Sequence, residues 1–325
     1  MHLCSYQKNQ KLKIHFDRFN FKSNDYGAIN VYNDSGVDLT IATTGNSSIM
    51  GCDGIGGVAI DMPNNNLIFT GTGNMTIYGG RGSNATSYGQ SGENGGNGIV
   101  AKSVTVDTED VLSYHLMVIG GDGGNGYSGA NGANGANGVE GYWNSDEDQR
   151  NPTSGGHGAN GGNGGKGGTG GNAIVVDSLN VISGDTVLTP GNGGNGGNGG
   201  KGGNGGKGGN GKKIDAYVWV ISDACSGYSG CNGGNGGNGG NGGNGGNAGQ
   251  AIVAYSVTGN YEEGYSINGL QGYGGAAGSF GAGGSRGYHR HMKVFGGWSD
   301  PEYGSNGSNG ASGKGGSGRT SYVIA

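Results

Sequence analysis

The most regular feature of the chain is the return of short apolar, β-branched blocks between long polar and glycine-rich tracts. Such blocks begin at Gly98 ("GIVAKSVTV"), Asn172 ("NAIVVDSLNVI") and Gln250 ("QAIVAYSVT"), and "SYVIA" closes the chain. Alternation of apolar and polar positions within the blocks predicts strands. Their recurrence at intervals of about 75 residues indicates a stacked array in which each repeat adds strands to a common base.

Aligning the blocks divides the chain. The positions that become equivalent are Ile99, Ile174, Ile252 and Val323. The predicted parts are an amino-terminal β-rich region, 1–98, and repeats at about 99–173, 174–251 and 252–321, followed by a partial repeat. A shorter relative of the blocks, "GVAIDMPNNNLIFTGTGNMTIYGG", starts at Gly57 within the amino-terminal region.

Each repeat contains two glycine tracts that flank a non-repetitive insert, and the two tracts are similar in length. The pairs are 120–138 with 155–172, 191–211 with 232–249, and 269–287 with the shorter 304–318. Similar lengths are expected if the chain runs out along one rod and back along another. A flexible linker, which is the alternative for glycine-rich sequence, has no reason to match its neighbour.

Glycine occupies every third position of these tracts, even where the other positions have diverged, as in "GLQGYGGAAGSFGAGGSRG" from Gly269. This period fits a polyproline-II helix, which has three residues per turn and a rise of about 3.1 Å. Such a helix has no internal hydrogen bonds, so its backbone must bond to neighbouring rods, and glycine allows that approach. The third position should face water. Residues expected there are Asn160, Asn163, Lys166, Asn195, Lys201 and Lys207.

Composition narrows the picture. The glycine content, 86 of 325 residues, is high enough to suggest collagen. The four prolines exclude it, because collagen requires roughly 15–20% Pro or hydroxyproline. The net charge of −5, without a basic stripe, argues against nucleic-acid binding. No run approaches the roughly 20 apolar residues of a membrane span, and the first residues lack the apolar region of a signal peptide.

The tracts resemble polyglycine-II bundles, which occur in the tip adhesins of T-even-like phage tail fibres and in springtail (snow flea) antifreeze proteins. The resemblance covers about 120–318 and rests on the three-residue period and on the alternation of tracts with variable inserts. In the phage adhesins such inserts form receptor-contacting loops at the distal apex. The resemblance therefore implies a bundle that presents the inserts at its tip.

The inserts contain all three tryptophans of the chain and many other aromatic residues, which give large contact areas at low entropic cost. Caps that only cover the rod ends are the alternative. The candidate ligand-binding residues are Tyr142, Trp143, Tyr217, Trp219, Tyr228, Tyr288, His289, His291, Phe295 and Trp298. A disulfide between Cys225 and Cys231 or two free thiols both fit the short spacing. His289 and His291 have no third ligand at zinc spacing, so no metal site is expected.

These observations predict a mainly β and irregular fold with little or no α-helix: a β-solenoid-like or sheet base carrying bundled polyglycine-II helices. No nucleophile stands with a base at a readable spacing, so neither an enzyme nor a cofactor is expected. The predicted function is that of an adhesin, at a cell or virion surface, that binds a protein or glycan receptor without inserting into a membrane. A subunit of a self-assembling extracellular filament is the main alternative, and an ice-binding protein is a minor one.

Overall fold

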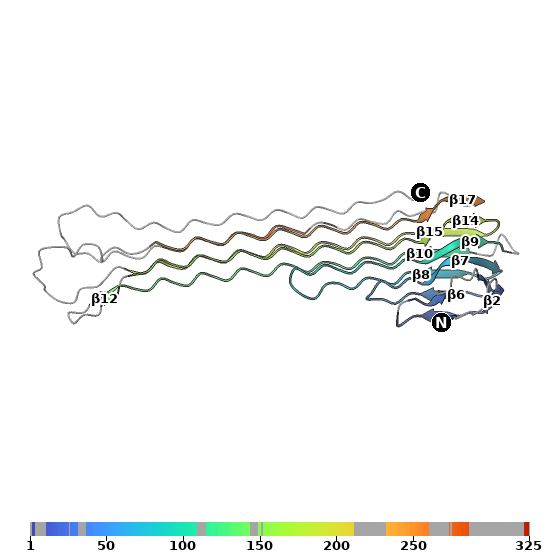
Figure 1. Cartoon of the computed structure of the whole chain (residues 1–325), viewed down its shortest axis with the longest axis horizontal. Helices are drawn as coiled ribbons and strands as arrows, with labels where there is room; N and C mark the ends of the chain where they lie inside the picture. Colours follow the sequence, from blue (N-terminus) through green and yellow to red (C-terminus); the bar gives the residue numbers. More distant parts are fainter. Residues whose placement is uncertain are drawn as a thin grey trace, which may run out of the picture.

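The computed structural model of the chain describes residues 2–3, 11–25, 27–31, 37–108, 115–143, 149–150, 152–210, 232–259, 273, 275–285 and 322–324. They form a block of strands from which long extended segments run to one side (Figure 1). This described part is mainly β-sheet and contains no helix, as the sequence predicts. It accordingly holds no helix with the length and apolar character of a membrane span.

In the described part of the chain the larger sheet has eleven strands, and every strand pair in it is parallel. Its main order is β1-β4-β7-β9-β13-β16-β18, with β2, β5, β14 and β17 joined beside that path. The bounds are β1 His2–Leu3, β2 Lys11–Phe16, β4 Ile29–Val31, β5 Asp38–Thr43, β7 Ile60–Gly71, β9 Ile99–Val106, β13 Ile174–Val175, β14 Ser178–Val181, β16 Ile252–Ala254, β17 Ser256–Gly259 and β18 Tyr322–Ile324.

The second sheet has five parallel strands in the order β15-β10-β8-β6-β3. Their bounds are β3 Asn20–Lys22, β6 Ser47–Met50, β8 Met75–Tyr78, β10 His115–Ile119 and β15 Asp185–Thr189. The chain passes from the larger sheet to this one and back again, so each circuit adds strands to both. Among the described strands, the only antiparallel pair is the separate hairpin of β11 (Tyr142–Trp143) and β12 (Gln149–Arg150).

Equivalent side chains of successive circuits stack in the core. Ile60 pairs with Ile99, Ile99 with Ile174, and Ile174 with Ile252, and all four are buried. The core is continuous across both sheets, because buried residues of the smaller sheet such as Ile77 belong to the same cluster. Alternation along each strand turns the apolar side chains inward, where burying one isoleucine stabilises the fold by about 1.5–3 kcal/mol.

The predicted alignment of the repeats is confirmed for Ile99, Ile174 and Ile252, and it is wrong by one residue at the last block. Ile252 pairs with Tyr322, and Val253 pairs with Val323. Backbone register is fixed by the ladder of hydrogen bonds. The closing residues "YVIA" can be aligned with "IVA" in two ways, as "YVI" or as "VIA". Residue types alone do not distinguish the two registers, and the sequence alignment used the second.

Circuits of the same kind run through the amino-terminal region, where the sequence analysis recognised only the shorter block that starts at Gly57. Asn20 pairs with Ser48, and Ser48 with Thr76, each 28 residues further on. The larger sheet continues from these circuits into the later repeats without a break at residue 98, since Ile60 of β7 pairs directly with Ile99 of β9.

One connection of the circuit becomes longer from each circuit to the next. The segments that leave the smaller sheet and return to the larger one are 23–28, 51–59, 79–98, 120–173 and 190–251. Their straight parts, and the corresponding part of the chain after β17, are called legs below: A (79–85), B (90–98), C (120–141), D (152–172), E (191–210), F (232–250) and G (273 and 275–285). Legs A, C, E and G run away from the sheets, and legs B, D and F return (Figure 1).

Candidate recognition site at the far end of the legs

The legs are joined sideways by backbone hydrogen bonds that recur at every third residue. Each leg donates to the leg before it in the chain. One such series runs across the bundle: the N–H of Gly278 bonds to the carbonyl of Gly240, that of Gly240 to Gly200, that of Gly200 to Gly162 and that of Gly162 to Ala130, at 2.7–2.8 Å. Legs A to E also donate to the next leg of the same direction, as Gly161 of leg D does to Asn238 of leg F (2.8 Å). The legs therefore form two cross-linked rows.

A third set of bonds uses side chains. The Oδ1 atom of Asn125 accepts the N–H of Asn195 on leg E, and the Oδ1 atom of Asn195 accepts the N–H of Tyr273 on leg G, both at 2.8 Å. Asn160 of leg D does the same for Asn238 of leg F (2.8 Å). Leg E thus has acceptors for all three N–H groups of its repeating triplet, as those of Gly199, Gly200 and Lys201 show, which is what a buried backbone requires.

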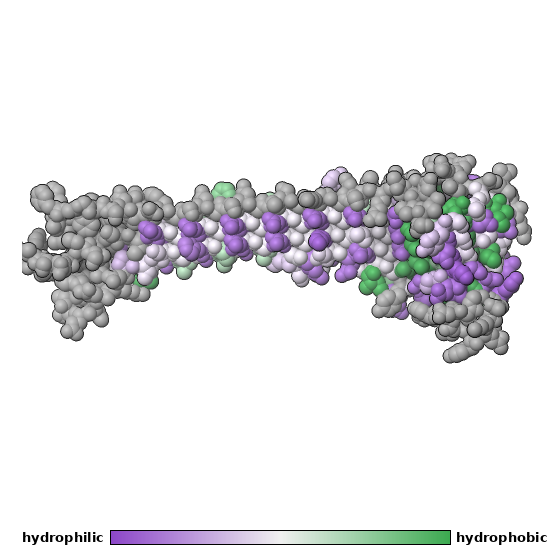
Figure 2. Space-filling view, turned by 45° about the horizontal axis from the view of Figure 1, so that its top comes forward, coloured by the Kyte–Doolittle hydropathy of each residue, from purple (hydrophilic) through white to green (hydrophobic). Residues whose placement is uncertain are grey.

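This finding changes the predicted role of the third position. Asn160, Asn163, Lys166, Asn195 and Lys201 are exposed, as expected, whereas Lys207 is half-buried. Figure 2 shows hydrophilic residues in evenly spaced groups along the rod. The asparagines are also lateral acceptors, a role that lysine cannot take. The missed signal is the prevalence of side chains that accept hydrogen bonds, mostly Asn, at this position.

Close approach of the backbones explains the glycines. A Cβ atom built on Gly240 would lie closer than 3.0 Å to the carbonyl oxygen of Gly162, and one on Gly200 would meet the carbonyl oxygen of Ala130 in the same way. The in-phase glycines of leg G behave alike, since a Cβ on Gly275 or Gly278 would meet a carbonyl of leg E. Glycine is therefore required wherever a Cβ atom would point at the backbone of a neighbouring leg.

The far ends of legs C, D, E, F and G lie together. They are joined by the N–H to carbonyl bonds Gly141–Asn210 (2.9 Å), Gly209–Thr153 (2.9 Å), Gly155–Asn232 (3.0 Å) and Gly208–Ser285 (2.8 Å). The three inserts of the sequence follow legs C, E and G. Segments that are far apart in sequence therefore start from neighbouring points at one end of the rod.

The predicted ligand-binding residues fall almost wholly outside the described residues. Tyr142 and Trp143 form β11 directly after leg C, where they pair with Arg150 and Gln149 of β12. The other predicted residues lie outside that part of the chain: Tyr217, Trp219, Tyr228, Tyr288, His289, His291, Phe295 and Trp298, together with Cys225 and Cys231. The two described residues thus stand on a hairpin at the end of the rod.

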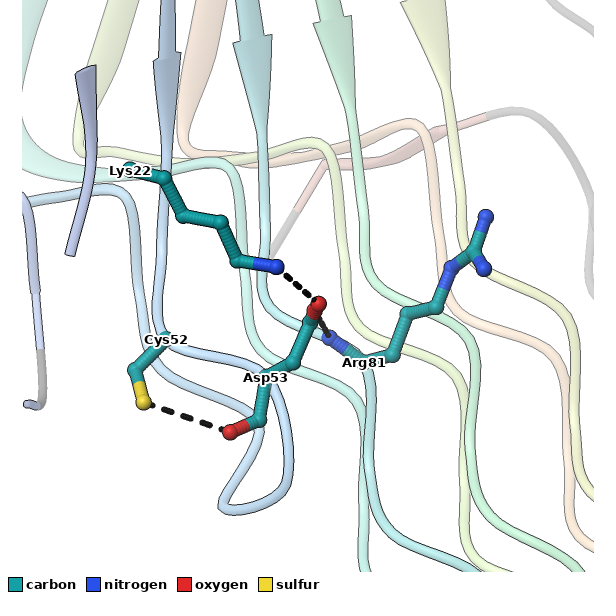
Figure 3. A network of polar contacts seen from close by, with 4 residues as sticks. All are labelled: Lys22, Cys52, Asp53 and Arg81. Carbon is teal, nitrogen blue, oxygen red and sulfur yellow. Dashed lines mark hydrogen bonds and ion pairs between the residues drawn. The ribbon is translucent and has the colours of Figure 1, made fainter. Parts of the chain in front are cut away.

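A second group of polar residues lies near the sheets (Figure 3). The Nζ atom of Lys22 is 2.6 Å from Oδ2 of Asp53, and the other carboxylate oxygen accepts the N–H of Arg81 (2.8 Å). The thiol of Cys52 faces the carbonyl oxygen of Asp53 at 3.2 Å, and the Arg81 guanidinium points away from the carboxylate. The contacts of Asp53 with Lys22 and with Arg81 join residues of three successive circuits.

The charges of this group act on Asp53. Burial alone would raise the pKa of Asp53, but the Lys22 hydrogen bond, the Arg81 N–H and both positive charges outweigh it and hold the pKa below its ordinary value. The group therefore stabilises the fold above the unfolded-state pKa, and that contribution is lost as the pH falls through the folded-state value. Because the Lys22 and Asp53 side chains are 52% and 38% exposed, the contribution stays below about 1 kcal/mol.

Metal ligands do not gather in the described residues, which contain no group of three or more His, Cys, Asp or Glu suited to an ion. No family model matches the chain, and no curated protein matches it. Among solved structures, the springtail antifreeze protein from Granisotoma rainieri, a nine-helix polyproline type II bundle, is 20% identical over 72% of this chain and 93% of its own. The TM-score of 0.11 is too low for that similarity to carry an argument.

Proposed function

We propose that the chain is a non-enzymatic recognition protein of a cell or virion surface, in which a rigid bundle holds aromatic segments against a receptor. The observation that carries the proposal is the meeting of legs C to G at one end. Segments 142–151, 211–231 and 286–303 connect to that end, and they contain every tryptophan of the chain. A protein or glycan of another surface is the proposed ligand.

The bundle is proposed to consist of polyglycine-II helices. A period of three, lateral bonds from each residue of the triplet, and glycine at each close approach support this assignment. With a rise of about 3.1 Å per residue, a leg of about 20 residues would span roughly 60 Å. Such a rod would hold the tip well away from the sheets, which form its base.

Rigid presentation suits recognition, because a binding segment fixed on a scaffold loses less conformational entropy on contact with its ligand. Tyr and Trp supply most of the binding energy in many protein interfaces. The β11–β12 hairpin, which contains Tyr142 and Trp143 and directly follows leg C, supports this proposal. Aromatic residues that merely covered the rod ends would need no ligand, and the experiment below separates these two roles.

The alternative of a filament subunit rests on a different observation. All pairs of the larger sheet are parallel, so the two edges of the described sheet have complementary pairing geometry, and exposed edges favour pairing. Ice binding requires a flat face of small residues, whereas the third positions of legs E and F present exposed Asn and Lys. Recognition at the tip is therefore the function that we favour.

Replacing the three tip segments by short Gly-Asn turns is expected to reduce binding to intact cells or immobilised glycans at least tenfold, with little change in thermal stability. The matched control changes the exposed base residues Ile182 and Tyr255 to Ser and should bind like the unmodified protein. Flow cytometry with labelled protein, together with electron microscopy for filaments, gives the readout. Unchanged binding by the tip variant, or filaments that depend on the base alone, would refute the recognition role.

A further inference from the structure

One flank of the bundle loses its neighbours part-way along the rod. Legs A and B are short. The last bonds to the long legs on this side are from the N–H of Gly89, in the turn between legs A and B, to Ser128 (3.0 Å), and from the N–H of Gly92 of leg B to Lys166 (2.9 Å). Further toward the tip, legs C and D continue without a described leg on that side. The flank of legs C and D beyond these bonds, from 129 to 141 and from 152 to 164, is called the free flank below.

The free flank has the hydrogen-bonding character of an open edge. Where leg B is present, the N–H groups of Gly124 and Tyr127 bond to Glu93 (2.8 Å) and Gln90 (3.0 Å). Three and more residues further on, the corresponding groups have no hydrogen-bond partner within the described part of the chain. These are the N–H groups of Ala130, Ala133 and Ala136. Unpaired backbone of this kind is a template for a further chain.

The residue type changes at the same point. Next to legs A and B the packed positions are glycine, and a Cβ on any of them would meet a carbonyl oxygen of leg A or B closer than 3.0 Å. These positions are Gly121, Gly124, Gly165, Gly168 and Gly171. On the free flank the equivalent positions include Ala130, Ala133, Ala136 and Ala159. Gly156 and Gly162 are the equivalent positions of leg D on either side of Ala159, and a Cβ on either would come no nearer than 3.1 Å to the atoms of another leg.

We infer that these four alanines close the free flank to a further glycine-rich leg, most directly one from a second copy of this chain. A leg that extended the path of leg A or B would place its carbonyl oxygens where the methyl groups now lie. Ala133, Ala136 and Ala159 are exposed, so the methyl groups stand at the surface that such a leg would have to approach. Legs of the same chain can therefore pack into the bundle, whereas the free flank excludes a glycine-rich leg of a second copy.

The test converts Ala130, Ala133, Ala136 and Ala159 to Gly and measures molar mass by size-exclusion chromatography with light scattering over a concentration series. Gain of a species of at least twice the wild-type mass is expected. The same four positions changed to Ser should keep the wild-type mass, because any Cβ blocks the approach. As a matched control, Ala276→Gly with Ala282→Gly alters exposed alanines whose N–H groups are already bonded, and it should leave the mass unchanged.

Binding of a labelled GGNGGNGGNGG peptide provides a second readout that needs no self-association. The glycine variant should bind it, and the wild-type and serine proteins should not. If circular dichroism shows that the fourfold variant is unfolded, Ala133→Gly with Ala136→Gly is measured in its place with the same expectations. A glycine variant that keeps the wild-type mass and ignores the peptide, or a serine variant that associates, would overturn the inference.

Discussion

Gly240→Ala is expected to lower the free energy of unfolding by about 1–3 kcal/mol or more, because the added methyl group overfills a closed contact. Its Cβ would collide with the carbonyl oxygen of Gly162 in the adjoining leg, and the collision cannot be relieved by a side-chain rotation, since both partners are backbone. Moving leg F away would break the bond from the Gly240 N–H to Gly200 (2.8 Å) and its equivalents along the leg.

The matched control is Gly162→Ala, the same substitution at the equivalent position of the neighbouring returning leg. Its Cβ would lie 3.1 Å from the nearest atom and point to the free flank, where Ala159 already carries a methyl group. A change in the free energy of unfolding of less than about 1 kcal/mol is expected, since the alanine also restricts the unfolded chain. Denaturant titrations of both variants give the comparison. Equal destabilisation would contradict the role of glycine in close packing.

Replacing an asparagine of the third position should lower the free energy of unfolding by an amount between those of Gly162→Ala and Gly240→Ala. The Oδ1 atom of Asn204 accepts the N–H of Ala282 at 2.9 Å. Asn204→Ala removes that acceptor and should cost about 1 kcal/mol, the usual net value of one hydrogen bond.

Ile99→Ala is expected to lower the free energy of unfolding by about 2–5 kcal/mol, the range for removing buried aliphatic groups. Ile99 is completely buried and pairs with Ile60 on one side and Ile174 on the other. Its truncation leaves a cavity inside a continuous ladder, which rigid neighbouring strands cannot fill. Val100→Ala on the opposite face of the same strand should cost less than about 1 kcal/mol. Similar losses for both variants in thermal or denaturant unfolding would place the core elsewhere.

The sequence predicts the fold where strand-forming blocks recur at a nearly constant spacing. The blocks at Ile99, Ile174 and Ile252 could be aligned because long glycine tracts separate them at similar distances. The earlier circuits pair residues 28 positions apart, as Asn20 and Ser48 do. Their excursions are only a few residues long, so they share no period with the later repeats and their relation emerges only from strand pairing.

The candidate site could be predicted from the sequence only in part. Matched tract lengths predicted that the inserts share one end of a rod, and the bonds between the far ends of the legs place their starting points together. The acceptor role of Asn125 or Asn160 depends on which leg lies two places further along. That neighbour is decided by packing between segments about 70–78 residues apart, which no local pattern specifies.

Amide hydrogen exchange across leg E tests the central claim that the glycine tracts are ordered and cross-linked. The N–H groups of Gly196, Gly197 and Gly200 donate to legs G and D, and that of Asn195 to a side chain of leg C. Residues 194–206 should therefore exchange orders of magnitude more slowly than an unstructured peptide, since exchange requires the bundle to open. Exchange of these amides at the rate of a free glycine-rich peptide would contradict the account.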